Sequence, residues 1–177
     1  MRKRAEGLRP AKGWLRRGRL VLALPAVRRS LLVLLLLPSA LILVYRVVPP
    51  PITPLMVWRL IQGEGLTKAW RPLSSISPEL PQAVIASEDN RFCEHAGFDW
   101  AELEHQFDRA WAGESTRGAS TITMQVAKNV LLWPGRDPVR KLFEAMLTPQ
   151  IELFWNKRRI IEIYLNVAET GPGLYAA

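Results

Sequence analysis

The sequence lacks several features that would point to particular kinds of protein. Its 177 residues include a single cysteine, Cys93, which excludes an intrachain disulfide and a structural zinc site built on several thiolates. Internal repeats, low-complexity blocks and convincing runs of alternating polar and apolar residues are also missing. Residues 30–177 carry 14 basic and 15 acidic side chains, so they have no excess of positive charge. A nucleic-acid-binding surface across the folded part is therefore not expected.

Positive charge is gathered at the N-terminus instead. Residues 1–29 hold ten Lys and Arg against one acid, and residues 30–48 are mostly apolar, close to the shortest length, about 17 residues, that spans a bilayer. This order predicts a basic cytoplasmic tail, 1–29, and a single transmembrane helix, 30–48, in the cytoplasmic (inner) membrane. The remainder is then expected on the outer, periplasmic face. A cleaved signal peptide is a rival interpretation, but it would need a better small-residue cleavage site. A buried core helix, the other rival, would not normally follow so many positive charges.

The residues after the apolar segment divide into a linker and a helical domain. Residues 49–77 begin with three prolines and continue as a polar, turn-rich stretch, which predicts a membrane-proximal linker. A short helix is expected at Met56–Ile61, and residues 63–77 are expected to have no regular structure. The domain is expected at 78–177, and its class is mainly α because apolar residues recur at helical spacing. The predicted helices cover residues 79–94, 99–112, 120–132, 137–153 and 157–167.

Acidic and imidazole side chains are concentrated between Glu88 and Asp99. If the helix that starts at 79 continues to 94, Glu88, Phe92 and His95 share one face at i, i+4 and i+7. A carboxylate beside an aromatic ring and an imidazole is a candidate general base, with Asp89 next to it. The alternative is a solvated helix end in which His95 and Asp99 cap a turn. Composition alone favours that alternative.

A second polar cluster starts at Ser120. Ser120 or Thr121 is suited to cap a helix, and the free N–H groups of such a helix end bind anionic oxygens. Thr121, Gln125 and Lys128 then lie on one face, where a hydroxyl, an amide and an ammonium group suit a sugar or phosphate ligand. An ordinary amphipathic helix explains the pattern equally well. The apolar face is expected in the core and consists of Ile122, Val126 and Val130.

Side chains of opposite charge share a predicted helix face in a third cluster. Arg140 and Glu144 are spaced i, i+4, Lys141 and Glu144 are spaced i, i+3, and Arg136 precedes the helix. The arrangement suits a cationic clamp on a pyrophosphate, for which Arg provides bidentate hydrogen bonds. A surface ladder of ion pairs, worth a few tenths of a kcal/mol, is the alternative.

The last predicted helix, at 157–167, carries a stripe that indicates packing rather than chemistry. Its members are Ile160, Ile161, Tyr164 and Leu165. The glycine-rich residues 171–176 resemble a dinucleotide fingerprint only superficially, because they follow a helix rather than a strand.

The four clusters follow one another in a specific order. They read Glu88-Asp89…Phe92…His95…Gly97…Asp99, Gly118…Ser120-Thr121-Ile122-Thr123…Gln125…Lys128-Asn129, Arg140-Lys141…Glu144, and Tyr164-Leu165-Asn166…Gly171…Gly173. This order strongly resembles the motifs of the peptidoglycan glycosyltransferase family, over about residues 50–177. The monofunctional biosynthetic transglycosylases, which are related to the glycosyltransferase module of class A penicillin-binding proteins, are the most similar type. No serine is followed by Lys three positions on, so a transpeptidase nucleophile motif is missing.

The resemblance implies a bilobed, lysozyme-like, mainly α fold and lipid II as the substrate. In the family the first-motif glutamate, here Glu88, is the general base on the 4-hydroxyl of the acceptor sugar. The growing chain is transferred with inversion, and undecaprenyl pyrophosphate is released. Glu144 matches the second essential carboxylate, which implies a catalytic role at the donor site and a ligand for a divalent cation such as Mg²⁺.

The same resemblance assigns the other site residues by position. Substrate or pyrophosphate binding is implied for Lys128, Arg136, Arg140, Lys141, Thr121, Gln125 and Asn129. Shaping of the cleft is implied for Asp89, Phe92, His95 and Ser120. The implied partners are lipid II, the growing glycan strand, the membrane and other proteins of cell-wall synthesis, with no nucleic acid.

Two departures from the family pattern leave alternatives open. Met124 stands where many members have the first of two glutamines, which is expected to matter little because Gln125 keeps its place. The family pattern continues beyond the fourth motif, so a C-terminally truncated domain is expected. One alternative function is therefore an inactive, membrane-anchored binding module. Another is a lysozyme-like hydrolase with two carboxylates, although a hydrolase has no pyrophosphate leaving group for the cations to stabilise.

Overall fold

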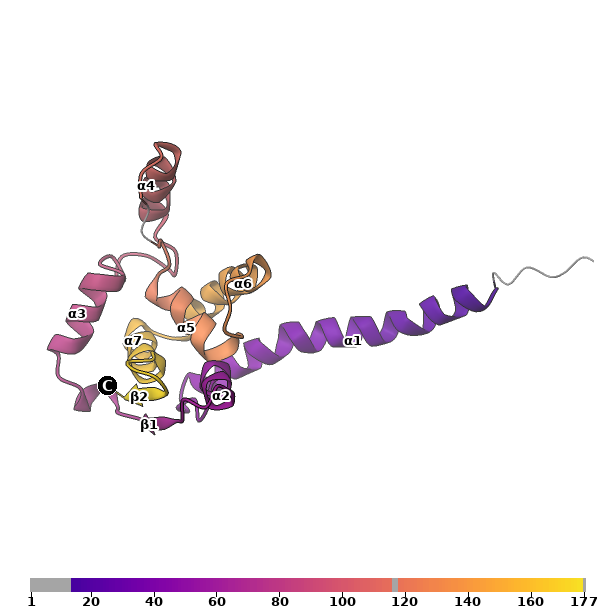
Figure 1. Ribbon diagram of the computed structural model, residues 1–177, viewed down its shortest axis with the longest axis horizontal. Coiled ribbons are helices and arrows are strands. Elements are labelled where there is room, and N and C mark those ends of the chain that lie inside the picture. The colour runs from indigo at the N-terminus through magenta and orange to yellow at the C-terminus, as the bar shows by residue number, and fades with distance from the viewer. Residues whose placement is uncertain (1–13, 116–117, 177) are drawn as a thin grey trace, which may run out of the picture. The chain divides into compact units, whose positions relative to one another are not determined.

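The computed structural model describes residues 14–115 and 118–176 (Figure 1). The chain divides into two units, residues 1–37 and residues 38–177. Helix α1 (Trp14–Tyr45) accounts for the described part of the first unit, and its last turns belong to the second. None of the helices in the described residues is both long enough and apolar enough to cross a membrane. The transmembrane helix at 30–48 stays a prediction, of which residues 30–45 lie in α1.

The second unit is mainly helical, as predicted. Its helices are α2 (Pro54–Ile61), α3 (Glu79–Glu88), α4 (Trp100–Trp111), α5 (Ile122–Leu131), α6 (Pro138–Phe154) and α7 (Lys157–Val167). Each of α4 to α7 begins and ends within two residues of its predicted limits. Residues 49–77, predicted as a linker, belong to the same unit as these helices. The bilobed, lysozyme-like arrangement stays a prediction.

Helix α5 lies at the centre of the core. It packs against α6 and α7, and α2 also contacts it (Figure 1). Its predicted apolar face, Ile122, Val126 and Val130, is buried, which confirms that prediction. Burial of each such side chain contributes about 1.5–3 kcal/mol to the free energy of folding, so these residues strongly favour the position of α5 in the core. The predicted core stripe of α7 is also confirmed, because Ile160, Ile161, Tyr164 and Leu165 are all buried.

The prediction that residues 63–77 have no regular structure was wrong. Strand β1 (Thr67–Ala69) pairs in parallel with β2 (Leu174–Ala176), and a short 3₁₀ turn, η1 (Leu73–Ser75), follows β1. Three-residue strands are too short to display the alternation that identifies a strand in a sequence. The approach of the two strands requires glycine at position 173. Gly173 has a φ of +65°, and a Cβ there would lie 2.5 Å from the Glu64 carbonyl oxygen.

The C-terminal turn of α1 is bonded to α6 and α7. Trp155 Nε1 donates to the Ile42 carbonyl at 2.7 Å. The Arg159 guanidinium donates to the Tyr45 carbonyl at 2.9 and 3.0 Å and to the Val48 carbonyl at 2.9 Å. The last carbonyl groups of a helix lack partners within that helix, and the Arg159 guanidinium provides donors for the Tyr45 carbonyl. The Ile42 carbonyl accepts from the Arg46 N–H as well as from Trp155.

Candidate active site

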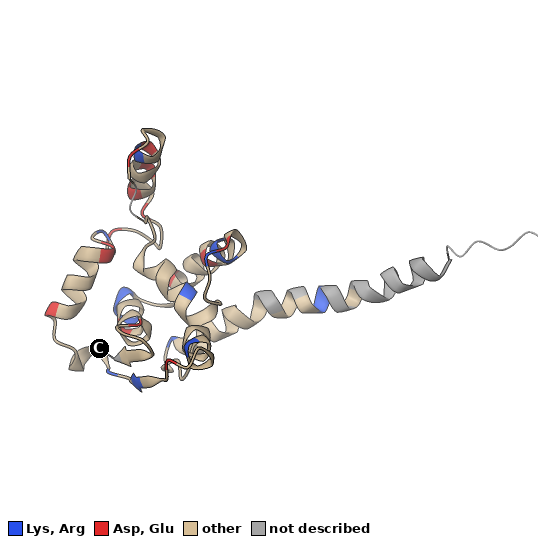
Figure 2. Cartoon of the chain, in the orientation of Figure 1, with Lys and Arg blue, Asp and Glu red and all other residues tan. Residues whose placement is uncertain are grey.

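Glu88 is the last residue of α3, and its carboxylate is exposed. Both ends of α3 are acidic and the residues between them are uncharged (Figure 2). The predicted continuation of this helix to 94 was wrong, and so was the shared face of Glu88, Phe92 and His95. Asp89 leaves helical geometry with φ −163° and ψ 72°, and the chain turns. Phe92 points into the core instead, 1% exposed, with its ring edge-on to His95.

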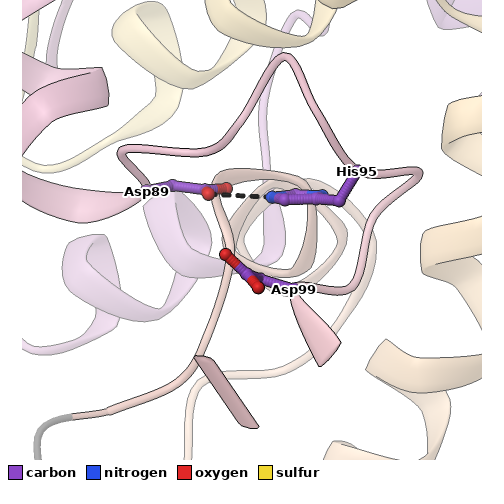
Figure 3. Close-up of side chains that lie close together, drawn as sticks. All are labelled: Asp89, His95 and Asp99. Carbon is purple, nitrogen blue, oxygen red and sulfur yellow. Dashed lines mark hydrogen bonds and ion pairs between the residues drawn. The ribbon is translucent and has the colours of Figure 1, made fainter. Parts of the chain in front are cut away.

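Asp89, which directly follows Glu88 in the chain, forms a buried pair with His95 (Figure 3). Asp89 Oδ1 lies 2.8 Å from His95 Nε2, and Asp89 Oδ2 accepts from the Ile122 backbone N–H at 2.9 Å. His95 Nδ1 accepts from the Gly97 N–H at 3.1 Å, which places the imidazole proton of the neutral ring on Nε2, facing the carboxylate. The Asp89 carboxylate also satisfies a free N–H at the start of α5. These bonds explain why the chain leaves the helix at Asp89.

Asp99 is the third member of this group. The ligand atoms of Asp89, His95 and Asp99 lie within 4.8 Å of one another, as in a metal site. However, Asp99 Oδ1 already accepts from the Glu102 N–H, as the N-cap of α4, and from Arg91. Both oxygens of Asp89 and both ring nitrogens of His95 are engaged as well. The group therefore acts as a hydrogen-bonded scaffold.

Thr121 connects this scaffold to α5. Its hydroxyl caps the helix by accepting from the Met124 N–H, and it donates to the Gly97 carbonyl at 2.7 Å. Gly97 is buried against α6 with a φ of +92°, and a Cβ there would lie 2.5 Å from Thr148 Cγ2. Only glycine fits both this conformation and this space. Met124 is buried, so an apolar side chain at the position of the missing glutamine suits its environment.

Gln125 is the residue of α5 that reaches Glu88. Gln125 Nε2 donates to Glu88 Oε2 at 2.9 Å, and Gln125 Oε1 accepts from the Tyr164 hydroxyl at 3.3 Å. Burial, assisted by the Glu88 charge, raises the pKa of Tyr164 to about 12. Tyr164 was not among the predicted site residues. Its helical spacing identifies it as part of the core, and the sequence carries no signal that its hydroxyl turns toward Gln125.

Lys128 lies one turn beyond Gln125, within electrostatic reach of Glu88. Burial lowers the pKa of Lys128, and the nearby Arg140 and Arg136 guanidinium groups lower it further, while the Glu88 carboxylate opposes them. Among the residues that the structure describes, no hydrogen bond or ion pair neutralises the Lys128 ammonium group. A partly buried cation without a direct ion-pair partner is suited to bind an anion. Asn129, the next residue, is buried.

Glu144 is held between two cations of its own helix. Arg140 and Lys141 both donate to it, with Lys141 Nζ 2.9 Å from Glu144 Oε2, and Glu144 is 2% exposed. The predicted ion pairs are thus present. The Arg140–Glu144 pair is buried, whereas Lys141 is exposed and reaches the buried Glu144 from the surface. Lys141 Nζ also donates to Ser120 Oγ at 2.8 Å. Partial burial lowers the pKa of Lys141, and the nearby Arg140 charge lowers it further. Within the described residues, the buried Arg140 Nε has no hydrogen-bond partner.

Glu144, the predicted metal ligand, does not suit a divalent cation in this arrangement. Each Glu144 oxygen already accepts from a cation, Oε1 from Arg140 and Oε2 from Lys141. The neighbouring side chains are positive, so they repel a metal ion instead of completing its ligand shell.

A cavity of about 480 Å³ opens beside Glu88. This volume lies within the range typical of small-molecule sites, about 300–1,000 Å³. The polar residues that line it include Glu88, Asn90, Glu102, Ser120, Thr121 and Gln125. Of the predicted residues of the first two motifs, the cavity is lined by Glu88, Asp89, Ser120, Thr121 and Gln125, but not by Phe92, His95, Lys128 or Asn129. From the third motif, Lys141 contacts the lining through its hydrogen bond to Ser120.

Comparison with known proteins decides which family has this arrangement. The family profile described as Transglycosylase matches residues 57–177, which include all four motifs. The chain belongs to the transglycosylase family. Relatives named biosynthetic peptidoglycan transglycosylase align with most of the chain at about 50% sequence identity. The biosynthetic peptidoglycan transglycosylase of Caulobacter vibrioides is 51% identical over 146 residues, which are 82% of this chain and 64% of the relative.

Two further transglycosylase relatives give the same result. The proteins of that name from Nitrobacter winogradskyi and Rhodospirillum centenum are 47% and 51% identical, over 90% of this chain and 68% of each relative. The chain thus spans roughly two thirds of the length of the curated relatives that it matches.

Proposed function

We propose that the chain polymerises peptidoglycan glycan strands from lipid II. The single observation that carries the proposal is the position of Glu88, an exposed carboxylate at a cavity, within electrostatic reach of Lys128, which has no ion-pair partner among the described residues. A base that takes a proton and a cation that receives a leaving pyrophosphate must act on opposite sides of one anomeric carbon. The electrostatic interaction between the two groups supports this arrangement, as do the names of the relatives.

The reaction starts at the acceptor. Glu88 takes the proton from the 4-hydroxyl of lipid II as that oxygen attacks the anomeric carbon of the growing chain. The bond from that carbon to the lipid pyrophosphate breaks, and the pyrophosphate leaves with its electron pair. Inversion follows from a single displacement, so an α-linked donor yields a β-1,4 linkage.

The leaving group is stabilised by the cations of α5, of α6 and of the segment between them. Lys128 and Arg136 supply charge that is already in place, so little reorganisation is needed when the pyrophosphate becomes more negative. Glu144 holds Arg140 and Lys141 through its two oxygens, and this positions the clamp. No step uses a metal ion, because Glu144 has no free oxygen to bind one. Any divalent cation that the reaction needs would have to arrive on the substrate pyrophosphate.

A lipid-linked substrate also requires the site to lie close to a membrane. Residues 30–48 are proposed as a single membrane anchor, with the basic residues 1–29 in the cytoplasm and the domain on the outer face of the cytoplasmic membrane. Other proteins of cell-wall synthesis are proposed as partners on that face.

The environment of Glu144 disfavours a lysozyme-like hydrolase that uses Glu144 as its second carboxylate. Hydrolysis by inversion or retention needs a second carboxylate that is free to contact water or sugar. Glu144 is buried and doubly ion-paired, so it is not available for that role.

The proposal is tested with the full chain in detergent, labelled lipid II and magnesium, and the products are resolved by size. Wild type should form long strands, and Glu88→Gln should abolish them while still binding lipid II, because only the proton acceptor is lost. Glu94→Gln is the matched control, since Glu94 is an exposed acid six residues after Glu88 and, within the described residues, its carboxylate pairs only with Arg91. Lipid II left intact by folded wild type would point to a binding module. Cleavage of finished peptidoglycan without polymerisation would point to a hydrolase.

A further inference from the structure

Two hydrogen bonds in series connect α7 to the proposed base. The Tyr164 hydroxyl donates to Gln125 Oε1, and Gln125 Nε2 donates to Glu88 Oε2. An amide has distinct ends, one an acceptor and the other a donor. Because Tyr164 offers a proton to the oxygen end, the nitrogen end is the one directed at the carboxylate.

Tyr164 is well placed to set this orientation. It is 7% exposed on the α7 face that packs against α5, so its ring is fixed by the core. Its hydroxyl remains protonated, and therefore a donor, throughout the neutral range. Helix α7 is itself fixed by Asn166, which exchanges two hydrogen bonds of 2.7 and 2.8 Å with the backbone of Arg71.

We propose that Tyr164 is a positioning residue, which orients the Gln125 amide so that it holds one oxygen of Glu88 and leaves the other for the acceptor hydroxyl. Within the described residues, Glu88 Oε2 receives the Gln125 bond, whereas no hydrogen bond reaches Oε1. A carboxylate fixed at one oxygen has fewer orientations to lose when the sugar binds. The inference rests on the proposed role of Glu88.

Loss of the tyrosine hydroxyl should release the amide. In Tyr164→Phe nothing holds Gln125 Oε1, so the amide rotates and presents its oxygen to the carboxylate for part of the time. That orientation is repulsive and moves the carboxylate away from its productive position. The defect concerns geometry in the reacting complex, so kcat should fall while KM for lipid II changes little.

The test compares Tyr164→Phe, Gln125→Ala and the double variant in the polymerisation assay. One neutral hydrogen bond corresponds to a fall in kcat of about 3- to 10-fold for Tyr164→Phe. On the Gln125→Ala background the same substitution should cause no further loss, because the hydrogen bonds that connect Tyr164 to Glu88 are already gone. Tyr175→Phe is the matched control, since Tyr175 is fully buried on β2 and its hydroxyl has no hydrogen-bond partner in the described part of the chain. Its activity should equal that of wild type.

A second readout does not depend on activity. The side-chain amide signal of Gln125 in an NMR spectrum, assigned by its loss in Gln125→Ala, should shift in Tyr164→Phe and in Glu88→Gln but not in Tyr175→Phe. An unshifted signal in Tyr164→Phe, wild-type kcat in that variant, or an additive loss in the double variant would each overturn the inference. An inactive wild type, or an active Glu88→Gln, would instead overturn the proposed function, and the NMR result would still report on the two hydrogen bonds.

Discussion

Replacement of Gly97 by alanine tests the tight contact between the scaffold that follows Glu88 in the chain and helix α6. Gly97 is buried with a φ of +92°, and an added Cβ would lie 2.5 Å from Thr148 Cγ2 and 3.1 Å from Glu152 Cγ. The positive φ costs an alanine about 1–2 kcal/mol. Overpacking of a buried site costs about 1–3 kcal/mol more. The expected loss of about 2–5 kcal/mol is a large part of the stability of a typical domain, about 5–15 kcal/mol.

Gly113→Ala separates the two contributions. Gly113 also has a positive φ, +74°, but an added Cβ there meets nothing within 4 Å. This control should lose only the conformational part. Urea unfolding of both variants in detergent, followed by tryptophan fluorescence, should place Gly97→Ala about 1–3 kcal/mol below Gly113→Ala. Equal losses would refute the close packing of Gly97 on Thr148.

The substitution should also reach the active site. Gly97 donates its N–H to His95 and accepts the Thr121 hydroxyl, so a shift of its backbone disturbs the support of Asp89 and the cap of α5. Gly97→Ala should therefore polymerise lipid II more slowly even at temperatures where it remains folded. Activity equal to that of Gly113→Ala would mean that the scaffold does not position Glu88.

Two further predictions concern the charged residues. Burial lowers the pKa of Lys128 below 10.5, so its ammonium group should lose its proton at a lower pH than an ordinary lysine, and the alkaline limb of kcat/KM should lie correspondingly low. Lys128→Arg should move the alkaline limb of kcat/KM to higher pH, because a guanidinium stays charged. The measurement is kcat/KM over neutral to alkaline pH. A limb at the same pH in both proteins would argue against a role for the Lys128 charge. Glu144→Gln should lower the free energy of unfolding by about 3–5 kcal/mol, because Arg140 is left buried without its counter-charge. Glu114→Gln, which affects only a partly exposed pair with Arg109, should cost about 1 kcal/mol or less in the same urea titration.

The helices and the local pairs could be predicted because their determinants lie within one segment. Helical periodicity places α4 to α7 within two residues, and the spacing of Arg140, Lys141 and Glu144 anticipates their ion pairs. The sequence also predicts a helix cap at Ser120 or Thr121, and the bond from the Met124 N–H shows that Thr121 is the cap.

The failures have causes that lie in distant segments. The helix ends at Glu88 because the Asp89 carboxylate accepts from Ile122, 33 residues away, and no local pattern carries that information. The hydrogen bond from the Tyr164 hydroxyl to Gln125, 39 residues earlier, could not be predicted either. A tyrosine on a buried helix face has the same spacing whether or not its hydroxyl makes such a bond. The burial of Glu144 also depends on the packing of α6 against α5, which ion-pair spacing does not reveal.

The bonds at the end of α1 set a limit on how far the chain can be shortened. Trp155 and Arg159 direct their N–H groups at carbonyl oxygens of Ile42, Tyr45 and Val48, so these three residues serve as acceptors for the folded body. A chain begun at the three prolines would leave the Trp155 indole and part of the Arg159 guanidinium without acceptors. Each unsatisfied buried donor costs about 1–3 kcal/mol. A shortened protein intended for solution work should therefore start before Pro38, so that it retains the last turns of α1.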